Sequence, residues 1–133
     1  MTSDKLKAEN YTELVVWQKG MALVKETYPI TRSFPADEKF GLVSQMRRAA
    51  VSIPSNIAEG QARRTTGEFI QFISQAEASV AELRTQFLIA VDLGFCTKAE
   101  AQPSLLLTSE LRKMLNGLRR KLVTRHSPLV TRH

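Results

Sequence analysis

The feature that most constrains the fold is a run of apolar residues that alternate in spacings of four and three between residues 69 and 90. The run consists of Phe69, Ile73, Ala76, Val80, Leu83, Phe87 and Ala90. This spacing places all of them on one stripe of an α-helix, and such a stripe suits the shallow crossing of about 20° found in four-helix bundles. We expect Thr66 to cap this helix, Glu68 to lie in its first turn and Gly94 to end it. The small Ala76 and Ser79 would let a neighbouring backbone approach closely.

The first and last segments of the chain also carry one apolar stripe each. The first helix is predicted to begin near Thr12 and to end at about residue 32, with the stripe Leu14, Trp17, Met21, Val24 and Tyr28. The last is predicted to begin after Pro103 and Ser104, with Thr97 as the alternative start, and to end near residue 123. Its stripe is Leu107, Leu111, Met114, Leu118 and Leu122.

A proline lies inside the second segment. This helix is predicted to run from about residues 35–38 to about residue 64, with the stripe Phe40, Val43, Arg47, Ala50 and Ile53 or Ile57. Because Pro54 has no N–H, we expect a kinked but continuous helix in which Ser52 and Asn56 satisfy the freed backbone groups. A break at Ser52 is the alternative. Gly60 is either a close helix contact or an early stop, and periodicity does not choose between them.

These four segments predict an all-α fold. Helices of about 20 to 30 residues with short connections must lie antiparallel, because each has one apolar stripe to bury. We therefore expect an antiparallel up-down-up-down four-helix bundle over residues 12–123, with a flexible N-terminus at 1–11 and a disordered basic tail at 124–133. A chain of 133 residues is long enough for one core. No segment alternates with period two, so no sheet is expected.

The charge of the chain is basic and unevenly distributed. Lys and Arg total 19 against 13 Asp and Glu, a net charge of +6 that favours contact with RNA, DNA or acidic protein surfaces. From Pro103 onward, Glu110 is the only acidic residue. The single cysteine, Cys96, and the lack of an apolar leader predict a cytoplasmic protein. No apolar run approaches the ~20 residues needed to cross a membrane.

Catalytic and metal-binding patterns are missing from the sequence. It contains no glycine-rich phosphate loop, no HExxH, no CxxC and no Gly-x-Ser-x-Gly. Both histidines fall in the expected tail, and no histidine is placed to activate the cysteine, which is predicted to be a packing residue. Glu59, Glu77 and Glu82 lack the Glu-x-x-His motif of bundle metal sites; Glu77 and Glu82 are instead expected to pair with cations on adjoining helices. We predict no enzyme, no cofactor and no metal.

Two groups of basic residues are the candidate nucleic-acid contacts, one in the middle of the chain and one in the last helix. They are Arg47, Arg48, Arg63, Arg64, Arg112, Lys113, Arg119, Arg120 and Lys121. A single phosphate contact is weak and salt-sensitive, so useful affinity needs many at once, which an oligomer would supply by repeating the patch. A solvated face is the structural alternative, and Arg63 and Arg64 could also complement a helix dipole. Trp17 and Phe72 could stack on bases, although aromatics at helical spacing favour a core position.

Several short motifs resemble one known family. They are Val16-Trp17-Gln18, Phe34-Pro35, Gly41-Leu42, Gln45 through Ala50, Ser52-Ile53-Pro54, Asn56 through Gly60, Glu68-Phe69, and Ser79 with Glu82-Leu83. Over about residues 11–95 the chain closely resembles the four-helix-bundle proteins known as 23S rRNA intervening-sequence proteins. Beyond Phe95 the resemblance is loose, so the interpretation of the basic last helix depends on its own residues.

The resemblance implies a fold, an assembly and a class of partner. Members of the family form antiparallel four-helix protomers that assemble as ring-like homopentamers, and they are encoded within inserted segments of ribosomal RNA genes or elsewhere in bacterial chromosomes. A related accessory protein of diversity-generating retroelements is similar in fold and binds its reverse transcriptase and nucleic acid. The family supplies no catalytic residue, and the stretch from Asn56 to Gly60 is expected to be architectural.

Together, the residues and the resemblance predict a non-catalytic, basic homo-oligomer, a pentamer by the resemblance, that binds RNA or DNA through phosphate contacts. The alternative is a protein-interaction adaptor that docks a partner such as a retroelement reverse transcriptase. In that case the same basic residues would meet an acidic protein face or a protein-bound nucleic acid.

Overall fold

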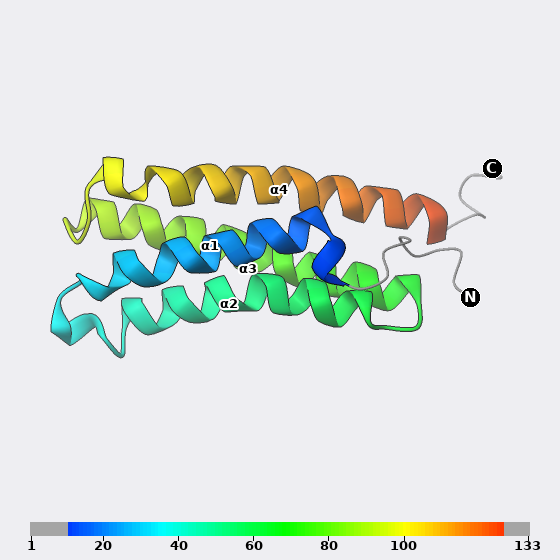
Figure 1. Ribbon diagram of the computed structural model, residues 1–133, viewed down its shortest axis with the longest axis horizontal. Coiled ribbons are helices and arrows are strands. Elements are labelled where there is room, and N and C mark those ends of the chain that lie inside the picture. The colour runs from blue at the N-terminus through cyan, green and yellow to red at the C-terminus, as the bar shows by residue number, and fades with distance from the viewer. Residues whose placement is uncertain (1–10, 127–133) are drawn as a thin grey trace.

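The computed structural model describes residues 11–126, which form a bundle of four antiparallel helices (Figure 1). A 3-10 helix at Tyr11–Glu13 precedes α1 (Val15–Arg32), a second at Ala36–Glu38 precedes α2 (Leu42–Gln61), and α3 (Thr66–Asp92) and α4 (Lys98–His126) follow. Each helix packs against the next in sequence, and α1 also packs against α4, which closes the bundle. The predicted all-α, up-down-up-down architecture is confirmed.

The α3 stripe forms the centre of the core, as predicted. All seven of its apolar residues are buried, from Phe69 to Ala90. The cap lies one residue earlier than expected: the Thr65 hydroxyl accepts a hydrogen bond from the Glu68 N–H at 3.1 Å. Gly94, at a φ of +78°, follows the helix in the left-handed conformation that glycine adopts without steric cost.

The predicted α1 stripe is wrong by about one position. The buried residues of α1 are Val16, Gly20, Leu23, Thr27 and Thr31, whereas four of the five predicted residues, from Trp17 to Tyr28, are only partly buried. Two threonines enter the core because their hydroxyls donate to backbone carbonyls one turn earlier, at 2.7 and 2.9 Å. Gly20 is buried because α2 approaches it closely: a Cβ added at this position would lie 3.3 Å from the Ile53 side chain. The aromatic flank of α1, formed by Trp17 and Tyr28, is therefore half-exposed and faces hollows beside α2.

Helix α2 continues through Pro54, so the alternative of a break at Ser52 is wrong. The Ser52 hydroxyl donates to the Ala49 carbonyl at 2.7 Å, and the Asn56 amide donates to the Ser52 carbonyl at 2.8 Å. The carbonyl that Pro54 leaves without a donor is that of Ala50, and neither bond reaches it, so the predicted role of Ser52 and Asn56 is wrong. Gly60 is the close contact of the two predicted alternatives, because a Cβ there would lie 2.8 Å from atoms of two α3 phenylalanines.

The start of α2 falls later than predicted, which removes Phe40 from the core. The Glu38 carboxylate accepts from the Leu42 N–H at 3.2 Å and so holds the first turn of α2 at residue 42. Phe40 lies before that turn and is 88% exposed. Phe34 instead buries its ring at this end of the bundle, 5.6 Å from that of Phe95.

Helix α4 begins at the earlier of the two predicted starts. The Thr97 N–H donates to the Glu100 carboxylate at 2.8 Å and the Glu100 N–H donates to the Thr97 hydroxyl at 3.0 Å, a reciprocal cap that makes a start at Pro103 wrong. Of the predicted stripe, Leu111 and Leu122 are buried and the other three are partly buried. The helix runs three residues past 123, to His126. The remaining predicted tail and residues 1–10 lie outside the described residues.

Candidate nucleic-acid interface

Six of the nine candidate cations are exposed and make no ion pair with any side chain in residues 11–126. They are Arg48, Arg64, Arg112, Lys113, Arg120 and Lys121. Exposed cations without a carboxylate partner keep their charge available to an outside anion. Their contact with nucleic acid stays a prediction.

The other three candidates are engaged within the bundle. Arg119 donates from Nε to the Glu77 carboxylate on α3 at 2.7 Å, and both side chains are largely covered. This is the interhelical pair predicted for Glu77, whereas Glu82 accepts from the Gln86 amide on its own helix instead of pairing with a cation. The pairing makes Arg119 primarily a link between α3 and α4.

Arg47 and Arg63 are held less tightly. Arg47 donates from Nε to the Thr31 hydroxyl at 2.9 Å, and its guanidinium lies 4.6 Å from the centroid of the Tyr28 ring. Arg63 lies 3.9 Å from the Glu59 carboxylate and 4.7 Å from the centroid of the Phe72 ring. Stacking on aromatic rings orients a guanidinium without neutralising its charge.

The fold gathers part of the charge at one end of the bundle. Figure 1 shows that the turn between α2 and α3 lies at the same end as the C-terminus of α4. Residues distant in sequence therefore share this end, which we call the basic end: Arg63, Arg64, Arg120 and Lys121. The prediction that the first two continue α2 is wrong, because α2 ends at Gln61 and they follow in the turn.

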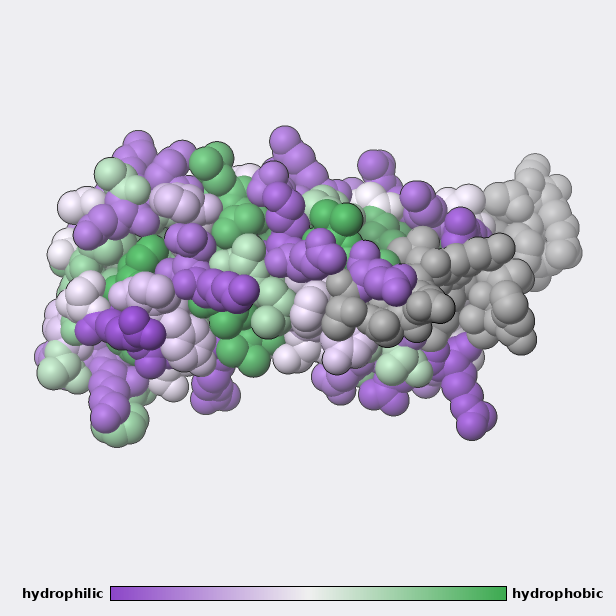
Figure 2. Space-filling model, in the orientation of Figure 1, coloured by the Kyte–Doolittle hydropathy of each residue, from purple (hydrophilic) through white to green (hydrophobic). Residues whose placement is uncertain are grey.

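The remaining exposed candidates lie away from the basic end. Arg112 and Lys113 are about two turns earlier on α4 than Arg120 and Lys121, or roughly 12 Å along the helix. Arg48 lies in the first half of α2, toward the opposite end. Figure 2 shows hydrophilic side chains over the length of this face, with hydrophobic residues exposed between them. The nine candidate cations are thus spread along the bundle, and four of them make up the basic end.

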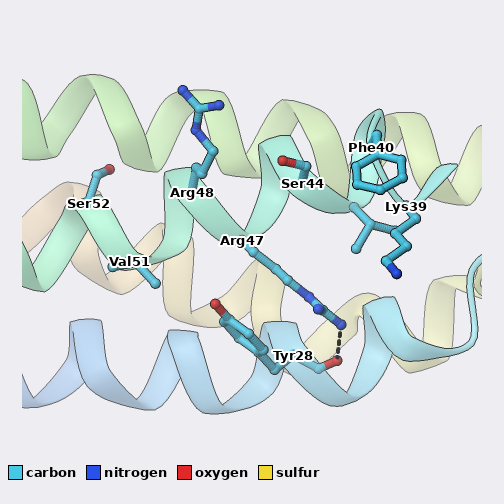
Figure 3. A pocket seen from close by; sticks show the side chains of 9 residues that line it. Tyr28, Lys39, Phe40, Ser44, Arg47, Arg48, Val51 and Ser52 are labelled. Carbon is cyan, nitrogen blue, oxygen red and sulfur yellow. Dashed lines mark hydrogen bonds between the residues drawn. The ribbon is translucent and has the colours of Figure 1, made fainter.

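A shallow groove over the first half of α2 was not predicted. We call it the α2 groove; its volume is about 680 Å³, and it is lined by Tyr28, Lys39, Phe40, Arg47, Arg48 and Val51, among others. In Figure 3, Tyr28 reaches it from α1, while Lys39 and Phe40 stand at the entry to α2. The spacing of apolar residues places Phe40 in the apolar stripe of the second helix. Its position next to Gly41, where a turn could precede the helix, is the sequence signal that it lies outside the core.

Arg84 is another residue that sequence reasoning missed. From the middle of α3 its guanidinium donates to the Leu105 carbonyl and to the hydroxyls of Thr108 and Ser109 on α4, at 3.0 to 3.2 Å. No motif marks it, because its partners are 21 to 25 residues away. These bonds make Arg84 a structural residue at the α3–α4 contact.

The environment of Cys96 disfavours a reactive thiolate. Cys96 is buried, and burial, with a contribution from the nearby Glu100 carboxylate, raises the pKa of its thiol. A raised pKa lowers the fraction of reactive thiolate.

Within residues 11–126 there is no cluster of three or more His, Cys, Asp or Glu side chains able to hold a metal ion. None of the four helices is long and apolar enough to span a bilayer.

Comparison with protein families gives a match over most of the chain. The family model described as 23S rRNA-intervening sequence protein matches residues 12–117. No curated protein matches the chain. The matched range includes all of α1 to α3 and most of α4, so it extends well past Phe95, where the resemblance of the sequence motifs becomes loose.

Proposed function

Because the chain belongs to the 23S rRNA-intervening sequence protein family, we propose that it is a non-catalytic homo-oligomer that binds nucleic acid through the phosphate backbone. The observation that carries the proposal is the set of six exposed cations without a carboxylate partner in the described chain. Unlike Arg119, which pairs with Glu77, these six leave their charge available to an outside anion. Three of them, Arg64, Arg120 and Lys121, stand exposed at the basic end.

Oligomerisation would multiply this surface. Contacts with single phosphates are weak, so a protomer with few of them binds weakly at physiological salt. A ring of identical protomers would present the basic end several times to one polyanion and raise the affinity by avidity. The homopentamer expected from the family resemblance would provide this, and light scattering measures it directly. A stable monomer at micromolar concentration would contradict the homo-oligomeric part of the proposal.

Binding is tested by fluorescence anisotropy with labelled RNA and DNA, single-stranded and duplex, over a salt series. Counterion release predicts that log K falls linearly with log salt concentration, with a slope of about −0.9 per phosphate contact on duplex DNA. The double variant Arg120→Glu, Lys121→Glu should weaken binding and reduce the magnitude of this slope by about two for each protomer that contacts the nucleic acid.

A matched control separates location from net charge. The double variant Lys25→Glu, Lys98→Glu changes the net charge by the same amount, and both lysines are exposed and lie outside the basic end. We expect this control to bind more tightly than the basic-end variant at every salt concentration. Equal losses would show that only overall charge matters, and the absence of binding by the unaltered protein at low salt would refute the proposed function.

A further inference from the structure

The most exposed large apolar side chain described is an aromatic one among cations. Phe40 is 88% exposed, and the Lys39 ammonium lies 5.5 Å from the centroid of its ring. Burying a phenylalanine is worth about 1.5–3 kcal/mol relative to leaving it in water, so the bundle gains nothing from this ring where it stands. The ring is therefore available to a ligand that covers it.

The charge of the α2 groove indicates what that ligand is. Lys39, Arg47 and Arg48 all line the groove, and none of the described residues lining it is acidic. Arg47 is oriented in advance by its hydrogen bond to Thr31 and by stacking on the Tyr28 ring, at 2.9 and 4.6 Å. A ligand that fits must bring negative charge and a flat apolar surface together.

Single-stranded nucleic acid has both properties. Its phosphates match the cations, and its unpaired bases can stack on an exposed ring, whereas the bases of a duplex are already stacked on one another. A second copy of this chain fits less well, because the cores of protein interfaces are depleted of charged residues, whereas three cations line this groove. Charge complementarity therefore favours the nucleic acid.

The groove continues along α1 and α2. Val51 lines both the α2 groove and a second hollow of about 330 Å³, which Trp17, Met21 and Pro54 also line; its described lining residues include no carboxylate. Tyr28 and Trp17 lie eleven residues apart on α1, or roughly 16 Å. A strand lying along this path would meet aromatic side chains at more than one level.

We propose that the α2 groove binds single-stranded nucleic acid, with one base stacked on Phe40 and adjacent phosphates on Lys39 and Arg48. This inference deepens the proposed function and depends on it. The bases would bind in the α2 groove, away from the basic end. The protein would therefore prefer a single strand of nucleic acid to a duplex.

The test compares Phe40→Ala with Phe40→Tyr, using a labelled oligouridine and an RNA duplex of the same length. Because the ring packs against little else, neither variant should impair folding, and circular dichroism checks this. Loss of one stacked base should weaken single-strand binding by about 5- to 150-fold in Phe40→Ala. The salt slope and duplex affinity should be unchanged. Phe40→Tyr, which keeps the ring, should bind the strand within about twofold of the unaltered protein.

Leu106→Ala is the matched control, because Leu106 is another exposed apolar residue, 56% accessible, on α4 and outside the groove. It should leave both affinities unchanged. Equal single-strand affinity in Phe40→Ala and the unaltered protein would overturn the inference while leaving the proposed function intact. A change of oligomeric state in Phe40→Ala, seen by light scattering, would also overturn it, because a second copy would then cover the ring. If no polynucleotide binds the unaltered protein, the proposed function itself fails.

Discussion

Replacement of Gly60 by alanine should destabilise the bundle, although alanine is the better helix former. A Cβ at this position would lie 2.8 Å from Phe69 Cδ1 and 2.8 Å from Phe72 Cβ. These distances are about 0.7 Å shorter than the ~3.5 Å at which carbon atoms pack best. Phe69 is fully buried, and the Cβ of Phe72 moves only with its backbone. The new methyl group must therefore push α2 and α3 apart.

The expected magnitude follows from two opposing effects. Overpacking of a core costs about 1–3 kcal/mol, and exchanging glycine for alanine within a helix returns up to about 1 kcal/mol. Separation of the helices would also weaken the hydrogen bond that joins Ser52 on α2 to Ser79 on α3, now at 2.6 Å. We expect a net loss of about 1–2 kcal/mol, or a fall in Tm of roughly 4–8 °C for a chain of this size.

Urea and thermal unfolding followed by circular dichroism measure this loss. Gly117→Ala is the control, because a Cβ at Gly117, in the middle of α4, would have no atom within 4 Å. That variant should be more stable than the unaltered protein by up to about 1 kcal/mol. If Gly60→Ala proves as stable as Gly117→Ala, the close approach of α2 and α3 is not the reason for glycine at this position.

Three further predictions concern other contacts. A double-mutant cycle on Arg119 and Glu77 should give a coupling of about 1 kcal/mol in urea unfolding; zero coupling would contradict a structural pair. Arg84→Met should cost about 1–2 kcal/mol, because it removes three hydrogen bonds to α4; unchanged stability would argue against them. Because burial raises the pKa of Cys96 in the folded state, the contribution of this thiol to stability is fully present below the pKa of the unfolded thiol and is lost as pH rises through the folded value. The native thiol should also alkylate more slowly than in urea, and equal rates would exclude protection.

The α3 helix shows what could be predicted from sequence. Its heptad spacing, its acidic first turn and the glycine after it are local features, and the helix they predict agrees with the structure to within about two residues at each end. The architecture followed from such patterns, because four one-sided helices with short connections have few ways to bury their stripes. The bundle and its antiparallel order therefore needed no tertiary information.

The candidate site could not be predicted to the same extent, because adjacent cations differ only in their neighbours. Arg119 and Arg120 are next to each other in sequence, yet one pairs with Glu77 and the other is exposed. Which of them meets α3 depends on the rotation of α4 about its own axis. Arg47 and Arg48 differ in the same way, because Arg47 stacks on the Tyr28 ring whereas Arg48 is exposed.

Sequence alone thus determined the number of helices, their order and the basic character of the chain, since helix periodicity and charge are properties of the residues themselves. Only the tertiary structure decided that two threonines and a glycine of α1 are buried while its aromatic flank is half-exposed. It also decided that Phe40 remains in water. The physical reason is that burial depends on which face a neighbouring helix covers, and close approach at Gly20 and hydrogen-bonded hydroxyls can outweigh hydropathy there.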